Sequence, residues 1–218
     1  MTDTRMRMRI LRYGSHALLV ECSDLAEVTA LYAELTRRRA AGMLPPLDDI
    51  VPAERTILID GLADGAALNA LAADLPTWQP SAEPPTRGGG KPIDIPVRYD
   101  AQDLAEVAAA WRVSESEVAA IHSAQEYRVA FCGFAPGFAY LVGLPEAYHL
   151  PRRPTPRVSV PPGSVAVAGP YTGVYPRSSP GGWHLIGTTD ADLWNLARDE
   201  PALLVPGSTV RFTPAASG

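Results

Sequence analysis

The stretch QPSAEPPTRGGGK, residues 79–91, divides the sequence into two parts. It contains three prolines and three glycines among its thirteen residues, and it has no large apolar side chain. Such a composition is typical of a linker, because it forms no helix and offers no apolar face to bury. The sequence therefore predicts two domains, residues 1–78 and residues 92–218, with a linker at 79–91 between them.

The part before the linker has the apolar periodicity of a small α+β domain. It predicts two strands within the first 21 residues, a helix after Asp24, two strands at about 47–51 and 55–60, and a second helix at about 64–75. The order ββαββα suits a small sandwich of helices on a sheet that resembles a ferredoxin-like fold.

The part after the linker begins with a strand and two short helices. The strand is expected at 93–99, with Asp100 as the cap of the first helix. Ser114 and Glu117 form the sequence signature of a capping box for the second helix, which carries His122 near its end.

Residues 133–187 differ in character from everything before them. Nineteen of these 55 residues are Gly or Pro, and seven of the sixteen aromatic residues of the chain lie among them. So much Gly and Pro excludes long helices, whereas the aromatic side chains supply more apolar area than a disordered segment carries. Short strands with elaborate turns remain, as in a β-barrel, with candidates at 164–168, 183–187 and 208–212. The chain as a whole is thus of the α+β class.

The charge balance argues against nucleic acid and membrane surfaces as partners. Nineteen Lys and Arg against twenty-four Asp and Glu give the 218-residue chain a formal net charge of −5. No overall positive field exists to attract phosphate backbones or anionic lipid. No stretch of sequence approaches the length of apolar residues that a membrane span needs. We expect a cytoplasmic protein.

Residues that could bind a metal are few. Cys22 and Cys132 are far apart and follow no zinc or disulfide spacing, so we expect reduced thiols and no structural metal. Asp190 and Asp192 are spaced to share one face of an extended segment and could hold Mg²⁺. Alternatively, they cap a short helix at 191–197.

The motifs of several common enzyme classes are absent from the sequence. Residues 88–91, GGGK, resemble the end of a phosphate-binding P-loop, but that motif requires Gly at position 85 and Ser or Thr at position 92, and both are Pro. The sequence also lacks the patterns GxSxG, HExxH and GxGxxG. Nothing therefore supports a serine-hydrolase elbow, a zinc protease or a dinucleotide-binding fold.

Three loops of the second part carry candidate binding residues. The first, residues 133–140, combines glycines that let backbone amides approach a ligand with aromatic rings that can wall a pocket. A purely architectural turn is the alternative. The candidate substrate contacts in this loop are Gly133, Phe134, Pro136, Gly137, Phe138 and Tyr140.

The second loop, PRRPTPR at 151–157, places three guanidinium groups on a segment that its prolines keep extended. In an extended chain Arg153 and Arg157 lie on the same side, so one can hold an anion while the other acts beside it. Arg152 and Arg153 are candidate substrate contacts, and Arg157 is a candidate catalytic residue. A solvated basic loop is the alternative.

The third loop, SSPGGW at 178–183, can present hydroxyls and amide donors to an oxyanion in the manner of a backbone nest. A tight barrel turn is again the alternative. The candidate substrate contacts are Ser179, Gly181, Gly182 and Trp183, with Ser164 and Tyr175 as further candidates outside the loop.

Two histidines are candidates for proton transfer. His122, at a predicted helix end, is either a complement to the helix dipole or a proton carrier. His184 follows the third loop on a predicted strand, so its side chain points away from that of Trp183, and one of the two should face the interior. His16 and His149 are expected to be structural.

Three longer segments carry a more specific pattern. They read GFAPGFAYLVGLP at 133–145, PRRPTPRVSVPPGSVAVAG at 151–169 and TGVYPRSSPGGWHLIGTT at 172–189. With weaker agreement over the rest of the chain, they resemble the family of the B subunits of 5-oxoprolinase, also called allophanate hydrolase subunit 1 or KipI-like. The resemblance implies a ferredoxin-like N-terminal domain and a cyclophilin-like β-barrel C-terminal domain.

The resemblance also implies that the chain is one component of a multi-chain enzyme and inactive alone. Its expected partners are a homologous barrel protein, the C subunit, together with an A subunit. The three chains are expected to open 5-oxo-L-proline to L-glutamate with ATP and Mg²⁺, with ATP bound mainly to the partner. Arg153, Arg157 and the Gly181–Gly182 amides would surround phosphoryl oxygens, and His122 or His184 would transfer a proton.

Two other functions stay open within the resemblance. One is a KipI-like binding module that inhibits a histidine kinase, and the other is a component of a urea or allophanate pathway enzyme. The sequence also departs from the family pattern, with His184 where Gln is usual, Thr188 where Arg is usual and Asn195 where an acidic residue is common. These departures leave the substrate open.

Overall fold

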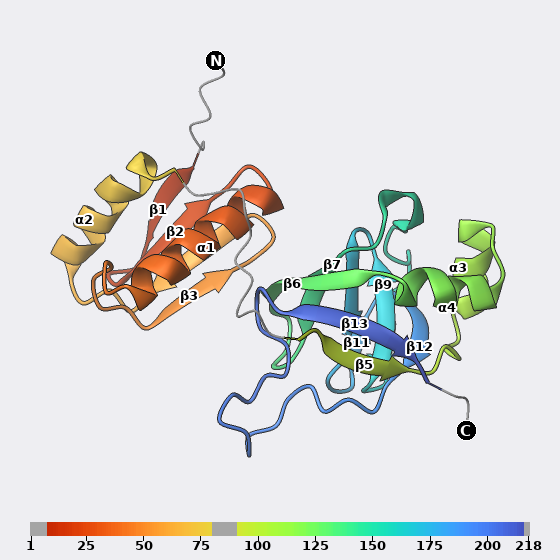
Figure 1. Ribbon diagram of the computed structural model, residues 1–218. Coiled ribbons are helices and arrows are strands. Elements are labelled where there is room, and N and C mark those ends of the chain that lie inside the picture. The colour runs from red at the N-terminus through yellow and green to blue at the C-terminus, as the bar shows by residue number, and fades with distance from the viewer. Residues whose placement is uncertain (1–7, 80–90, 216–218) are drawn as a thin grey trace. The chain divides into compact units, whose positions relative to one another are not determined.

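The computed structural model describes residues 8–79 and 91–215. The chain forms two compact units, Met1–Pro85 and Thr86–Gly218. The two units share no sheet (Figure 1). Each has its own apolar core. The predicted linker at 79–91 lies almost wholly outside the described residues.

The first unit is a four-stranded antiparallel sheet covered by two helices. Its strands lie in the order β1-β2-β4-β3, and each hydrogen-bonded pair is antiparallel. The elements are β1 (Arg9–Tyr13), β2 (Ala17–Glu21), α1 (Leu25–Ala40), β3 (Asp49–Pro52), β4 (Thr56–Asp60), α2 (Gly65–Asp74) and the short 3-10 helix η1 (Leu75–Thr77). The predicted order ββαββα is confirmed. The ferredoxin-like assignment stays a prediction.

Both helices of this unit begin at an aspartate and cover the same face of the sheet. Asp24 accepts a hydrogen bond from the amide of Glu27 (2.9 Å), and Asp64 caps α2 in the same way. These bonds satisfy amides that the first turn of a helix leaves without partners. The apolar side chains of α1 and α2 share one core with the alternate residues of β2 and β4 that face them.

The second unit is built on a seven-stranded sheet in the order β12-β9-β10-β7-β6-β13-β5. Its strands are β5 (Ile93–Val97), β6 (Glu126–Cys132), β7 (Ala139–Val142), β9 (Ser164–Ala168), β10 (Tyr171–Val174), β12 (His184–Thr188) and β13 (Thr209–Pro214). Neighbours are antiparallel except β13 and β5, which are parallel. A separate two-stranded sheet pairs β8 (Arg157–Val160) with β11 (Ser179–Gly181), and a 3-10 helix η2 (Glu146–Tyr148) follows β7.

A bridge between the two edge strands curls this sheet into a near-closed barrel. The amide of Arg98 donates to the carbonyl of Thr188 (2.9 Å), and the amide of Thr188 donates back to the carbonyl of Arg98 (2.8 Å). Closure of this kind removes the exposed edges that an open sheet presents. The predicted α+β class with a barrel-like second part is confirmed, whereas its cyclophilin-like assignment stays a prediction.

Two helices, α3 (Leu104–Trp111) and α4 (Glu115–Ser123), follow β5. The capping box of Ser114 and Glu117 is present at α4. The prediction that Asp100 caps α3 was wrong, because Asp103 precedes that helix and Asp100 instead accepts a bond from the hydroxyl of Thr188 (3.2 Å). The helix expected at 191–197 is absent, and that segment consists of turns and one isolated bridge. Within residues 8–79 and 91–215, no helix has the length and apolarity of a membrane span.

Candidate functional site

A cavity of about 280 Å³ lies where the three predicted loops meet in the second unit. Nine of the predicted substrate contacts line it: Phe134, Phe138, Tyr140, Arg152, Arg153, Tyr175, Gly181, Gly182 and Trp183. Pro156 and Pro180 complete the lining. The volume is close to the lower end of the range for small-molecule sites, about 300–1,000 Å³. Loops that are far apart in sequence thus form one concave site.

Aromatic rings form one wall of this cavity. The ring of Phe138 meets those of Tyr175 (centroids 5.3 Å apart) and Trp183 (5.6 Å) edge to face, and Tyr140 meets Trp183 in the same way (5.6 Å). Phe138, Tyr175 and Trp183 are buried, so packing fixes their positions before any ligand arrives. The wall suits the flat apolar face of a small molecule.

Phe134 extends this wall to the surface in an unusual backbone conformation. Its φ of 69° lies in the left-handed region that side chains rarely adopt, and 57% of the residue is exposed. Two backbone hydrogen bonds hold the turn around it. The amide of Ala135 donates to the carbonyl of Gly133 (2.8 Å), and the amide of Phe138 donates to the carbonyl of Ala135 (2.9 Å). The loop therefore keeps an aromatic ring exposed at some cost in backbone energy, as binding loops often do.

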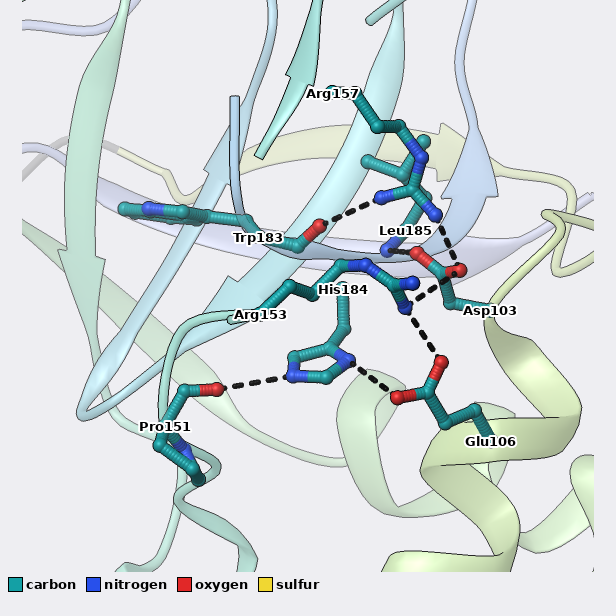
Figure 2. A network of polar contacts seen from close by, with 8 residues as sticks. All are labelled: Asp103, Glu106, Pro151, Arg153, Arg157, Trp183, His184 and Leu185. Carbon is teal, nitrogen blue, oxygen red and sulfur yellow. Dashed lines mark hydrogen bonds and ion pairs between the residues drawn. The ribbon is translucent and has the colours of Figure 1, made fainter. Parts of the chain in front are cut away.

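Two arginines of the second loop bind the same buried carboxylate. Arg157 donates from Nη2 to Oδ1 of Asp103 (2.5 Å), and Arg153 donates from Nη1 to the same oxygen (3.2 Å) and to Glu106 Oε2 (2.5 Å) (Figure 2). Arg157 also donates to the carbonyl of Trp183 (3.3 Å). The hydrogen bond with Glu106 raises the pKa of Arg153. The predicted pairing of Arg153 and Arg157 around an anion is therefore realised, but the anion is a side chain of the protein.

Asp103 connects three elements of the second unit. It is only 4% exposed, and its Oδ2 accepts the amide of Leu185 (2.8 Å) while its own amide donates to the carbonyl of Leu185 (3.2 Å). The start of α3, the arginine loop and β12 thus meet at one carboxylate (Figure 2). The sequence analysis did not indicate Asp103 as a site residue. An acidic residue just before a helix is common as an ordinary helix cap, so nothing in the sequence marked it out.

Comparison with known proteins identifies the family to which this chain belongs. Residues 8–204 match the family model described as carboxyltransferase domain, subdomain C and D. The chain belongs to this family. The B subunit of 5-oxoprolinase from Escherichia coli O157:H7 is 49% identical over 160 residues, which cover 71% of this chain and 72% of that protein. Its counterpart from Haemophilus influenzae is 48% identical over 126 residues, which cover 56% of this chain and 59% of that protein.

Solved structures support the same assignment. TTHA0988 is 39% identical, with a TM-score of 0.72, over 98% of this chain and 41% of that chain. The chain therefore spans less than half of that relative. The urea carboxylase of Kluyveromyces lactis is 16% identical, with a TM-score of 0.63, over 98% of this chain and 23% of that chain. At that identity the likeness shows the fold alone.

His122 does not lie at the cavity of this carboxyltransferase-domain protein. It is fully buried, with Nδ1 2.8 Å from the hydroxyl of Tyr99 and Nε2 3.3 Å from the hydroxyl of Thr172. Its ring also packs against Tyr127 and Phe212. Burial lowers the pKa of His122 to about 3. The structure thus gives no support to the predicted role of His122 as a proton carrier, because the imidazole lies in the core and does not line the cavity.

His184 lies behind the wall of the cavity and does not line it. Its Nε2–H donates to the carbonyl of Pro151 (2.9 Å), and its buried Nδ1 lies 3.7 Å from Glu106 without a hydrogen-bond partner among the described residues. Both His184 and Trp183 are buried, although only one of them was expected to face inward. The arginine loop and α3 cover the histidine side of the strand. The geometry thus gives His184 a structural contact in place of the predicted catalytic one.

The remaining predicted contacts lie beside the cavity. Gly133, Pro136 and Gly137 line a second hollow with Trp194, next to the exposed ring of Phe134. The predicted role of two serines in substrate contact does not match their bonds, which are those of turns. The hydroxyl of Ser164 donates to the carbonyl of Pro161 (2.8 Å), and that of Ser179 donates to the carbonyl of Arg177 (3.2 Å).

The acidic pair considered for Mg²⁺ is bound by arginines. Asp190 pairs with Arg98 (2.7 Å), and Asp192 pairs with Arg198 (3.0 Å). Within the described parts of the chain, no group of three or more His, Cys, Asp or Glu side chains is arranged to hold a metal ion. Neither the metal site nor the helix caps considered for these residues fits the observed contacts.

Proposed function

We propose that this chain is the B subunit of an ATP-dependent 5-oxoprolinase, which opens 5-oxo-L-proline to L-glutamate together with its C and A subunits. The observation that carries the proposal is the identity of nearly one half to relatives that are B subunits of 5-oxoprolinase. The likeness to a urea carboxylase rests on 16% identity, so it supports a shared fold and not a shared substrate.

The chemistry of the cavity supports a small cyclic amide as the substrate. A five-membered lactam is a poor electrophile. Transfer of the γ-phosphoryl group from ATP to its oxygen, with release of ADP, makes the carbonyl carbon easier for water to attack, and phosphate leaves as the ring opens. Catalysis of such a transfer consists mainly of positioning and charge stabilisation. The aromatic wall of Phe138 and Trp183 offers a flat surface for the ring, and the guanidinium groups of Arg152 and Arg153 lie at the cavity.

ATP, with its Mg²⁺, is proposed to bind mainly to the homologous barrel partner. A cavity of about 280 Å³ suits a molecule of the size of 5-oxoproline and leaves little room for a nucleotide beside it. Arg157 and Arg153 are held by Asp103, so their part in the reaction would be to keep the rim of the cavity rigid. We therefore expect the isolated chain to be inactive.

A reducing, cytoplasmic location accords with the two cysteines. Both are free thiols. Burial raises the pKa of Cys22 to about 11 and that of Cys132 to about 11, which keeps both in the unreactive protonated form at neutral pH. Neither thiol is therefore proposed to take part in catalysis.

The proposal is tested by co-expression of this chain with its proposed C and A subunits and an ATPase assay on the purified complex. ATP consumption should depend on 5-oxo-L-proline and should not be supported by urea or allophanate. Consumption driven by urea or allophanate instead would replace this function with the urea-pathway alternative. Copurification with a histidine kinase, without the C subunit, would favour the KipI-like alternative.

A further inference from the structure

Two of the three arginines in the loop at 151–157 are paired with carboxylates. Arg153 and Arg157 face the carboxylates of Asp103 and Glu106, so two positive and two negative groups neutralise one another. Arg157 also donates to the backbone carbonyl of Trp183. A ligand anion would have to compete with these carboxylates for the charge of either guanidinium group, although the Nε of Arg153 has no hydrogen-bond partner among the described residues.

Arg152 is the arginine of the same loop that lies outside this network. It lines the cavity and is exposed, and within residues 8–79 and 91–215 it makes no hydrogen bond or ion pair. Its charge acts on Tyr175, where burial raises the pKa of the hydroxyl and the guanidinium of Arg152 opposes that rise. Arg152 therefore supplies an uncompensated positive charge near the Tyr175 end of the aromatic wall.

These features together define a class of ligand. One side of the cavity is a wall of buried rings, and one charged group has its five donors free for a planar acceptor. A carboxylate accepts a guanidinium through two parallel hydrogen bonds. The volume limits the ligand to a small molecule. The complementary ligand is a small ring that carries one carboxylate.

We propose that Arg152 binds the carboxylate of such a ring and thereby determines specificity for an anionic over a neutral cyclic substrate. The ring would lie against Phe138 and Trp183. For 5-oxo-L-proline this places the carboxylate at Arg152 and the lactam oxygen away from it. The assignment to 5-oxoproline rests on the proposed function, whereas the preference for a cyclic carboxylate does not.

The first test uses the complex with the C and A subunits. Arg152→Ala should raise the KM for 5-oxo-L-proline about tenfold or more, with a much smaller change in kcat, because a charge-assisted bond to the ground-state carboxylate is lost. Arg152→Lys should recover part of this loss. Arg177→Ala is the matched control, since Arg177 is also exposed and does not line the cavity. An unchanged KM for Arg152→Ala would overturn the proposal.

The second test uses the isolated full-length chain and two probes, cyclopentanecarboxylate and neutral cyclopentanemethanol, followed by ligand-observed NMR. The carboxylate should bind more tightly than the alcohol in the unmodified chain, and Arg152→Ala should abolish that preference. Equal binding of the two probes, or equal loss of preference in Arg177→Ala, would also overturn the proposal. Melting curves of the variants should match that of the unmodified chain, because the side chain is exposed.

The two tests separate this inference from the proposed function. If the chain prefers the carboxylate through Arg152 but the complex does not consume ATP with 5-oxoproline, the site stands and the function fails. If 5-oxoproline drives ATP consumption and the KM of Arg152→Ala is unchanged, the function stands and the site fails.

Discussion

Arg157 donates a hydrogen bond to the buried carboxylate of Asp103, 54 residues earlier in the chain, at 2.5 Å. The same carboxylate holds Arg153 and the backbone of Leu185. One side chain thus fixes the arginine loop, which borders the cavity, against α3 and β12. We infer that Asp103 is a positioning residue for the cavity and not a ligand contact, since it does not line the cavity.

Replacing Asp103 should therefore destabilise the second unit. Asp103→Ala leaves the guanidinium groups of Arg153 and Arg157, which are 26% and 19% exposed, without their common acceptor. Loss of one partner from a buried ion pair costs about 3–5 kcal/mol, and the partial exposure of the arginines reduces this to about 2–3 kcal/mol. Urea denaturation should measure that loss in the free energy of unfolding.

Glu106 provides the matched control for this variant. It binds the same Arg153 but is 56% exposed, so Glu106→Gln should cost less than about 1 kcal/mol. Equal losses for Asp103→Ala and Glu106→Gln would contradict the central role of Asp103.

Gly181 is required by the position of a neighbouring ring. A Cβ at this position would overlap the hydroxyl oxygen of Tyr175 and lie 2.9 Å from its Cζ. Gly181→Ala should therefore cost about 1–3 kcal/mol through overpacking, and adding Tyr175→Phe should recover part of that loss. A double-mutant cycle on the free energy of unfolding should give a coupling of about 1 kcal/mol between the two sites. Strictly additive effects would show that the two groups do not compete for space.

The candidate residues of the three loops could be identified because their signals are local. Glycines, prolines and aromatic residues concentrate in these segments, and the capping box at Ser114 is likewise written in four adjacent positions. The cavity accordingly has nine predicted residues in its lining. Segment composition is thus informative about where a concave site forms, even when the strand order is unknown.

Partners that are distant in the chain could not be predicted in the same way. Asp100 and Asp103 both precede a helix, and only the barrel closure decides which of them meets the arginine loop. His122 shows the same limit, since its place at a helix end favoured exposure. The helix that carries it packs on β13, so the ring lies inside the core. Burial of a polar side chain depends on which distant parts of the chain pack against it in the folded structure.

Phe134 should respond to substitution in the reverse of the usual order. At a φ of 69°, alanine carries a steric cost that glycine does not. Phe134→Gly should therefore be more stable than Phe134→Ala by about 1 kcal/mol, although glycine is normally the less stable of the two. Ala135→Gly, at a neighbouring position without a positive φ, should show the normal order and lose stability. Thermal unfolding of the three variants compares them directly. A less stable Phe134→Gly would contradict the strain assigned to this loop.

His122 should make the stability of the protein depend on pH. Its pKa falls from 6.5 to about 3 on folding, so below pH 6.5 the unfolded chain binds a proton that the folded chain does not. Stability is therefore highest above pH 6.5 and decreases as the pH falls toward 3. Between pH 7 and pH 5 this group alone should lower the free energy of unfolding by about 2 kcal/mol.

The pH effect of His122 can be isolated by comparing the unmodified protein with His122→Gln. Glutamine keeps polar atoms for Tyr99 and Thr172 but does not titrate, and every other ionisable group is common to both proteins. The hydrogen bond with Arg37 lowers the pKa of Glu34 to about 2. Above pH 5 Glu34 is mostly ionised in both the folded and the unfolded chain, so it adds little to the pH dependence of stability between pH 5 and pH 7. Urea denaturation at pH 7 and pH 5 should give a loss about 2 kcal/mol smaller for His122→Gln than for the unmodified protein. Equal losses of unfolding free energy in the two proteins would mean that His122 takes up a proton in the folded state as readily as in the unfolded state. Solvent would then have to reach the imidazole in the folded protein.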